Sequence, residues 1–106
     1  MRHWRPHELH EWLRRPGPAP QLVDVREPWE FALCRIEGSM NLPLHTLAAV
    51  RVRLEPEHET VVICHHGIRS RMAGQYLEQM GFTDVINLSG GVAAWASDID
   101  AAMATY

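Results

Sequence analysis

The residues with the clearest capacity for chemistry lie together in the segment Cys64-His65-His66-Gly67-Ile68-Arg69-Ser70. A cysteine acts as a nucleophile through its thiolate, but a free thiol has a pKa of about 8.5, so only a small fraction is ionised at neutral pH. Backbone N–H groups of residues 65–70, folded around the sulfur, can stabilise the anion, and Arg69 adds a positive charge. The segment therefore predicts a nucleophilic Cys64 in an anion-binding loop, although an isolated cysteine at a strand end is more often a small buried apolar side chain.

The flanking residues predict a strand before this loop and a helix after it. Residues 60–64 are apolar and β-branched, as in a central strand covered on both faces, and residues 69–80 repeat apolar side chains at helical spacing. Cys64 then lies at the carboxyl end of a strand, where ligands bind in open α/β folds. A helix dipole contributes about 0.3–1 kcal/mol, less than the roughly 1.4 kcal/mol in one pKa unit, so the loop itself must supply most of the stabilisation.

The rest of the chain continues the alternation of strands and helices. Further strands are predicted at 21–25 and 85–88, and helices at 5–15, 29–33, 43–54 and from 91 onward, with a stiff connector at 16–20 and a turn at 37–41. Short loops between alternating strands and helices predict an α/β fold with a mostly parallel central sheet and helices on both faces.

Length and composition limit the classes of protein to be considered. The chain has 106 residues, 46% of them hydrophobic, which predicts one domain over residues 1–106 with its core at about 5–104. A chain of this size needs neither a disulfide nor a structural metal to fold. The absence of a long apolar stretch and of a signal peptide predicts no membrane partner and a cytoplasmic location. The net charge of −3, without a basic stripe, predicts no nucleic-acid partner.

Four motifs give the chain a resemblance to a known family. They lie, in order, at residues 22–31, 36–43, 64–70 and 87–91, the last followed by Trp95, and together they resemble a single-domain rhodanese. The resemblance covers nearly the whole chain and implies the small three-layer rhodanese fold. It also implies a sulfurtransferase without a cofactor, in which Cys64 carries a persulfide sulfur from a small anionic donor, thiosulfate or a persulfide, to a thiol, a thiol protein or cyanide.

The resemblance implies a role for each residue of the loop and for two residues before it. Cys64 is the catalytic residue. The substrate-binding residues are His65, His66, Gly67, Ile68, Arg69 and Ser70. Arg69 is expected to hold the oxygens of the donor, the alternative being a pair with a carboxylate, while each histidine is either functional or a solvated rim residue. Asp24 and Arg26, in the first motif, are expected to hold the loop and the sheet together.

Two other functions remain open. One is a module that carries persulfide sulfur without turnover, or docks onto a partner protein. The other is a phosphatase or arsenate reductase, but those relatives have a loop one residue longer than the six residues from Cys64 to Arg69. A phosphate would be poorly held in the shorter loop, so the sulfurtransferase is favoured.

Two groups of residues outside the loop could also carry chemistry. Cys34 occupies a position where the family commonly has a glycine, and it is interpreted as a buried thiol, with a resolving cysteine for Cys64 as the alternative. His3, His7 and His10 follow each other at a spacing that could bind a divalent metal on the first helix, but a solvated helix face is favoured. No metal site is predicted.

Overall fold

The computed structural model describes all residues 1–106 and contains a five-stranded parallel sheet with strand order β1-β5-β4-β2-β3. The strands are β1 (Arg2–Trp4), β2 (Gln21–Asp24), β3 (Met40–Asn41), β4 (Thr60–Ile63) and β5 (Val85–Leu88). The helices are α1 (Pro6–Leu13), α2 (Pro28–Leu33), α3 (Leu47–Val50), α4 (Ile68–Gln79) and α5 (Gly91–Asp98), with 3₁₀ turns at Leu44–Thr46 and Arg51–Arg53. The predicted α/β fold class is confirmed.

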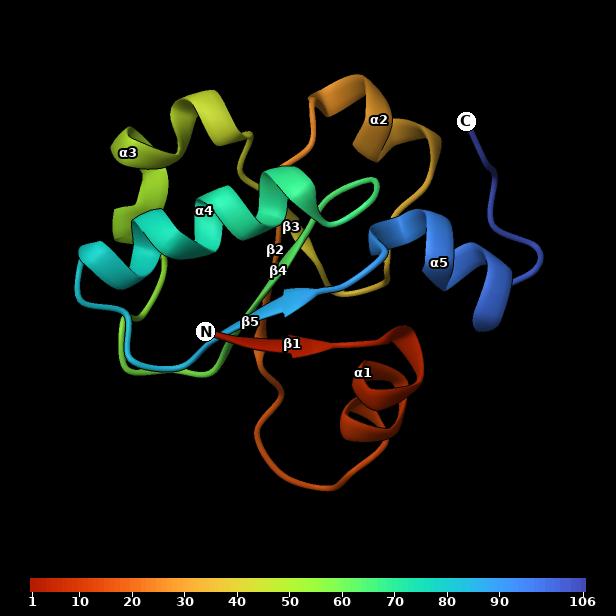
Figure 1. Cartoon of the computed structure of the whole chain (residues 1–106), viewed down its shortest axis with the longest axis horizontal. Coiled ribbons are helices and arrows are strands. Elements are labelled where there is room, and N and C mark those ends of the chain that lie inside the picture. Colours follow the sequence, from red (N-terminus) through yellow and green to blue (C-terminus); the bar gives the residue numbers. More distant parts are fainter.

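Helices cover both faces of the sheet (Figure 1). The central strand β4 is buried along its whole length, and its side chains alternate between two hydrophobic cores. Val62 and Cys64 face the core formed with α3 and α4, whereas Val61 and Ile63 face the core formed with α1 and α5. The loop after β4 therefore leaves the sheet from its most buried strand, which gives Cys64 a rigid attachment.

The beginning of the chain differs from the sequence prediction, which placed no strand there. Arg2, His3 and Trp4 form β1 and pair in parallel with β5, where Trp4 is opposite Leu88. Three residues are too few to show a strand periodicity, so the pairing arises only from contacts distant in sequence. As a consequence His3 lies on a strand and His7 on α1, and the prediction that His3, His7 and His10 share a helix face is wrong.

Two predicted helices are shorter than expected. The segment 43–54 is divided into α3 and two 3₁₀ turns because Thr46 and Val50 each take a tight conformation, with ψ of −4° and −5°. Both residues are β-branched, which lowers their helix propensity. The last helix ends at Asp98, and Asp100 then caps a turn by accepting the N–H of Ala102 on its side chain. Residues 99–106 therefore form a tail outside α5.

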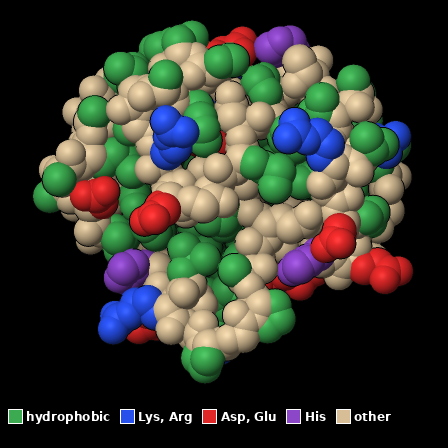
Figure 2. All heavy atoms as spheres, turned by 180° about the vertical axis from the view of Figure 1, so that it is seen from behind, with side chains coloured by type: hydrophobic (Ala, Val, Ile, Leu, Met, Phe, Trp, Pro, Cys, Tyr) green, Lys and Arg blue, Asp and Glu red, His purple; other side chains and the backbone are tan.

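The surface carries charges of both signs. On the face shown in Figure 2, arginine, histidine and acidic side chains are scattered among apolar and uncharged ones. None of the helices combines the length and the apolar character needed to cross a bilayer.

Candidate active site

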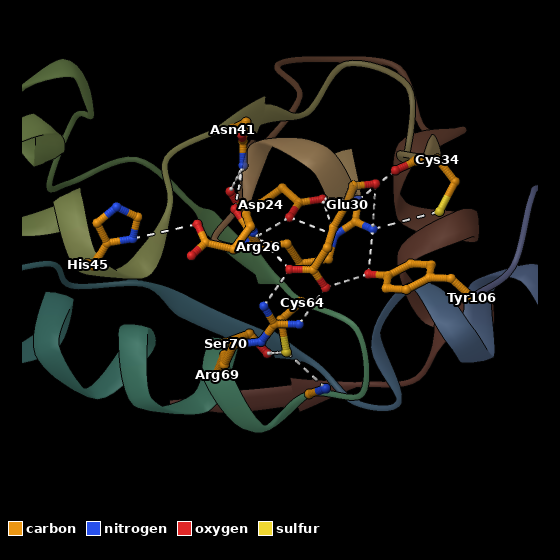
Figure 3. Close-up of polar contacts among 12 residues, drawn as sticks. Asp24, Arg26, Glu30, Cys34, Asn41, His45, Cys64, Arg69, Ser70 and Tyr106 are labelled. Carbon is orange, nitrogen blue, oxygen red and sulfur yellow. Dashed lines mark hydrogen bonds and ion pairs between the residues drawn. The ribbon is translucent and has the colours of Figure 1, made fainter. Parts of the chain in front are cut away.

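Cys64 lies at the first position after β4 and is almost completely buried, with 1% of the residue exposed. Its Sγ accepts a hydrogen bond from the N–H of Gly67 at 3.1 Å and lies 3.3 Å from Oγ of Ser70 (Figure 3). The Ser70 hydroxyl donates in turn to Oδ1 of Asn87 on β5, at 2.5 Å. The thiol thus accepts from the Gly67 N–H and donates to the Ser70 hydroxyl, whose own proton is used by Asn87.

The loop around the sulfur holds several further backbone donors. Gly67 has a φ of +99°, which turns the chain back toward Cys64, and α4 begins at the next residue. The N–H groups of residues 65, 66 and 68–70 donate to no acceptor in the protein. An anion bound in the loop can accept hydrogen bonds from such groups at low cost, because they need no rearrangement.

The start of α5 fastens this loop from the other side. The N–H of Val92 donates to the carbonyl of Cys64 at 2.9 Å, and that of Ala93 to the carbonyl of His65 at 3.1 Å. Gly91 has a φ of +58°, and a Cβ there would collide with both of these carbonyl oxygens. The glycine therefore permits the close approach that fixes the orientation of the Cys64 backbone.

Arg69 is paired with a carboxylate. Its Nη1 and Nη2 donate to the two oxygens of Glu30 at 2.7 and 2.8 Å, so the guanidinium forms a bidentate ion pair with α2. Hydrogen bonding to Glu30 raises the pKa of Arg69 above its ordinary value. Of the two orientations considered for Arg69, this geometry is that of the carboxylate pair. The ion pair joins the start of α4 to α2.

The Glu30 carboxylate is a junction between four donors. Besides Arg69, it accepts the N–H of Glu27 at 2.9 Å and the hydroxyl of Tyr106 at 2.8 Å. The bonds from Arg69 lower the pKa of Glu30 to about 2, in spite of burial, which acts in the opposite direction. Glu30 is therefore ionised across the physiological range and ties α2, the loop and the tail together.

This pKa predicts a pH-dependent loss of stability in the Glu30→Gln variant. Because the folded-state pKa is about 2 and the ordinary value is 4.5, the ionised Glu30 contributes stability above about pH 5 and loses it as the pH falls toward 2. At pH 7 the variant should be less stable than the wild type by about 2–3 kcal/mol. Urea unfolding at pH 7, 5 and 3 should show this difference shrinking at low pH, whereas a constant difference would contradict it. Glu27→Gln, a partly exposed neighbour, is the control.

Asp24 and Arg26 form a completely buried ion pair beneath the loop, each with 0% exposure. The Arg26 Nε and Nη2 donate to the Asp24 carboxylate at 2.7–3.0 Å. Nη2 also donates to the Cys34 carbonyl at 2.6 Å, and Nη1 to the Glu30 carbonyl at 3.3 Å. Burial alone lowers the pKa of Arg26, but its bonds to Asp24 and Tyr106 outweigh this and raise it. The pair attaches α2 to the end of β2, and neither side chain forms a hydrogen bond with the loop.

Cys34 belongs to this buried network. It is buried and free, and its Sγ lies 3.7 Å from Nη1 of Arg26. Its sulfur accepts a hydrogen bond from Arg26, whereas the Cys64 sulfur is bonded to Gly67 and Ser70. In this conformation the two thiols occupy separate environments.

Three residues that sequence reasoning did not place at the site are Glu30, Asn87 and Tyr106. Glu30 and Asn87 lie within two of the motifs but carry no local signal of their partners. The ring of Tyr106 stacks on His65 at 4.0 Å and 11°, and His65 stacks on His66 at 4.0 Å and 29°. Burial lowers the pKa of His65, and the charge of His66 acts in the same direction.

Comparison with known proteins decides the family. The family model for the rhodanese-like domain matches residues 5–98. The chain belongs to the rhodanese-like family. The resemblance noted in the four motifs is thereby confirmed, and the parallel sheet with its loop after the central strand is the fold expected for this family.

Named relatives and solved structures of rhodanese-like proteins agree. The chain is 40% identical over 90 residues to the thiosulfate sulfurtransferase GlpE of Pseudomonas fluorescens, covering 85% of this chain and 81% of that one. The chain is also 33% identical over 105 residues to the rhodanese-like/PpiC domain-containing protein 12 of Arabidopsis thaliana. This alignment covers 93% of the chain but only 35% of the longer relative. A rhodanese-like domain protein from Staphylococcus aureus superposes with a TM-score of 0.84 at 30% identity, over 90% of this chain and 91% of the other.

Proposed function

We propose that this rhodanese-like chain is a sulfurtransferase that moves a sulfane sulfur from thiosulfate or a persulfide to a thiol or to cyanide through a persulfide on Cys64. The observation that carries the proposal is the position of the Cys64 sulfur in a six-residue loop, with the Gly67 N–H on the sulfur and several other N–H groups unpaired. The relatives named thiosulfate sulfurtransferase support it.

In the first half of the reaction, the Cys64 thiolate attacks the outer sulfur of thiosulfate. A bond forms between Sγ of Cys64 and that sulfur, the sulfur–sulfur bond of thiosulfate breaks, and its electron pair leaves with sulfite. The product is a persulfide anion on Cys64. The terminal sulfur carries the negative charge, and the backbone N–H groups of the loop are the donors proposed to stabilise it.

In the second half, an acceptor takes this sulfur. Cyanide or a thiolate attacks the terminal sulfur of the persulfide, the bond to Cys64 breaks, and its electron pair returns to Sγ as a thiolate. The products are thiocyanate or a new persulfide, together with the original enzyme. A sequence of two such displacements predicts ping-pong kinetics.

The remaining loop residues are proposed to serve binding. His65, His66, Gly67, Ile68, Arg69 and Ser70 form the loop that follows Cys64, and of these Gly67 and Ser70 contact the sulfur. Because the Arg69 guanidinium is bound to the ionised Glu30, we propose that it serves donor binding by holding the end of the loop against α2. Asp24 and Arg26 are proposed to support α2, which carries Glu30.

A panel of donors tests the function against its alternatives. With thiosulfate and cyanide, we expect repeated turnover to thiocyanate, and with an aryl phosphate we expect no release of phenol. A single stoichiometric transfer without turnover would favour the carrier module. Hydrolysis of the aryl phosphate in the absence of a sulfur donor would favour the phosphatase and overturn the proposal.

A further inference from the structure

Tyr106, in the tail that follows α5, is linked to both ends of the Cys64 loop, directly at His65 and through Glu30 at Arg69. At the start of the loop, its ring lies flat on His65 with the centroids 4.0 Å apart. At the other end, its hydroxyl donates to Oε2 of Glu30 at 2.8 Å, and the same oxygen accepts from Arg69 at 2.8 Å. Figure 3 shows the Tyr106 hydroxyl directed toward the Glu30 carboxylate that also binds Arg69.

The tail is held in this place almost entirely by the Tyr106 side chain. Arg26 donates to its hydroxyl at 2.9 Å, and the ring of Trp29 meets it edge-on at 5.7 Å. In contrast, no backbone group of residues 104–106 takes part in a backbone hydrogen bond. A segment without such bonds opens at low free-energy cost compared with the strands and helices, so the tail can leave the loop without unfolding of the core.

The burial of Cys64 makes this contact relevant to substrate entry. Cys64 is 1% exposed, and Ala104, Thr105 and Tyr106 line a small cavity together with His65, the residue that follows Cys64, and with His66 and Cys34. The phenol is neutral at physiological pH, because burial raises the pKa of Tyr106 to about 12. The wall beside the loop is therefore an uncharged ring that is fixed by hydrogen bonds to buried ionic groups.

We propose that Tyr106 is a movable wall of the Cys64 site that selects sulfur donors by size. With Tyr106 stacked on His65, we expect only a small inorganic donor such as thiosulfate to reach the buried sulfur. A bulky organic persulfide, such as that of a tripeptide thiol, requires the tail to swing away and breaks the contacts to Glu30, Arg26 and His65. This inference rests on the proposed function for its donors, but access to the thiol can be measured without turnover.

The test compares the alkylation of Cys64 by two reagents of one chemistry and different size, iodoacetamide and a fluorescein-bearing iodoacetamide. The proteins carry Cys34→Ser, so that Cys64 is the only thiol. We expect Tyr106→Ala to raise the rate constant for the bulky reagent about tenfold more than that for iodoacetamide. Tyr106→Phe keeps the ring but loses both hydrogen bonds and should give an intermediate change. Tyr76→Phe, whose hydroxyl bonds only Arg51, should leave both rates unchanged.

Two results would overturn the inference. One is an unchanged ratio of the two alkylation rates in Tyr106→Ala, with thermal unfolding confirming that the variant is folded. The other applies if the protein turns over both donors. We expect Tyr106→Ala to raise kcat/KM for glutathione persulfide, relative to that for thiosulfate, about tenfold over the wild type. An unchanged ratio of these two kcat/KM values would contradict the inference. If neither donor is turned over, the proposed function fails, while the alkylation ratio still decides whether Tyr106 controls access.

Discussion

Replacing Arg26 with alanine is expected to lower the free energy of unfolding by about 3–5 kcal/mol, a large part of the stability of a small protein. The change leaves the carboxylate of Asp24 without its partner at 0% exposure, and it also removes the donors to the carbonyls of Glu30 and Cys34. An uncompensated charge in the interior is far more costly than a lost surface contact. Urea unfolding at pH 7 measures the difference.

A matched control separates this effect from the loss of any arginine. Arg35 is exposed and lies over the ring of Phe31 at 4.5 Å, so Arg35→Ala should cost less than about 1 kcal/mol. A double variant in which Asp24→Asn is combined with Arg26→Met should lose less than the sum of the two single changes, because neither charge is left alone. If Arg26→Ala costs no more than Arg35→Ala, the buried pair does not support α2 as described.

Replacing Cys64 with serine is expected to reduce thiocyanate formation from thiosulfate and cyanide by at least about 10³-fold, to the uncatalysed level. The serine hydroxyl can occupy the place of the sulfur beside Gly67 and Ser70, so the fold should be kept. It cannot form the sulfur–sulfur bond that the first half of the reaction requires. The rate of thiocyanate formation, followed over a range of thiosulfate concentrations, measures the loss.

The second cysteine provides the control for this experiment. Cys34 contacts Arg26 within the buried network and has no contact with the loop sulfur, so Cys34→Ser should keep turnover within about threefold of the wild type. A large loss in Cys34→Ser would favour the alternative in which Cys34 resolves the Cys64 persulfide. Equal activity in Cys64→Ser and the wild type would exclude Cys64 as the sulfur carrier.

The loop after the central strand and the position of Cys64 in it were predictable because their signals are local. The strand at 60–63 shows as a continuous β-branched run and the helix from 68 as apolar side chains at helical spacing, and Cys64 is at the junction that open α/β folds use for binding. The close approach of α5 to the loop was visible only as a pair of glycines, Gly90 and Gly91. The reason for these glycines is the pair of hydrogen bonds from α5 to the carbonyls of Cys64 and His65. These bonds are visible only in the folded structure.

The ionic and aromatic contacts were not predictable in the same way, because their partners are far apart in sequence. Glu30 and Arg69 are separated by 39 positions, and Arg26 and Tyr106 by 80. A guanidinium beside an anion-binding loop can point to a ligand or to a carboxylate, and nothing in the residues next to Arg69 in the sequence distinguishes the two. The edge strand β1 was missed for a related reason, since its three residues are ordered by pairing with β5.

The most direct test of the central claim is the intact mass of the protein after incubation with thiosulfate alone. The account predicts a gain of about 32 Da, one sulfur atom, on the wild type and on Cys34→Ser, and no gain on Cys64→Ser. Addition of cyanide should remove the extra mass as thiocyanate forms. A persistent 32 Da gain on Cys64→Ser, or no gain on the wild type under conditions of turnover, would contradict a persulfide on Cys64.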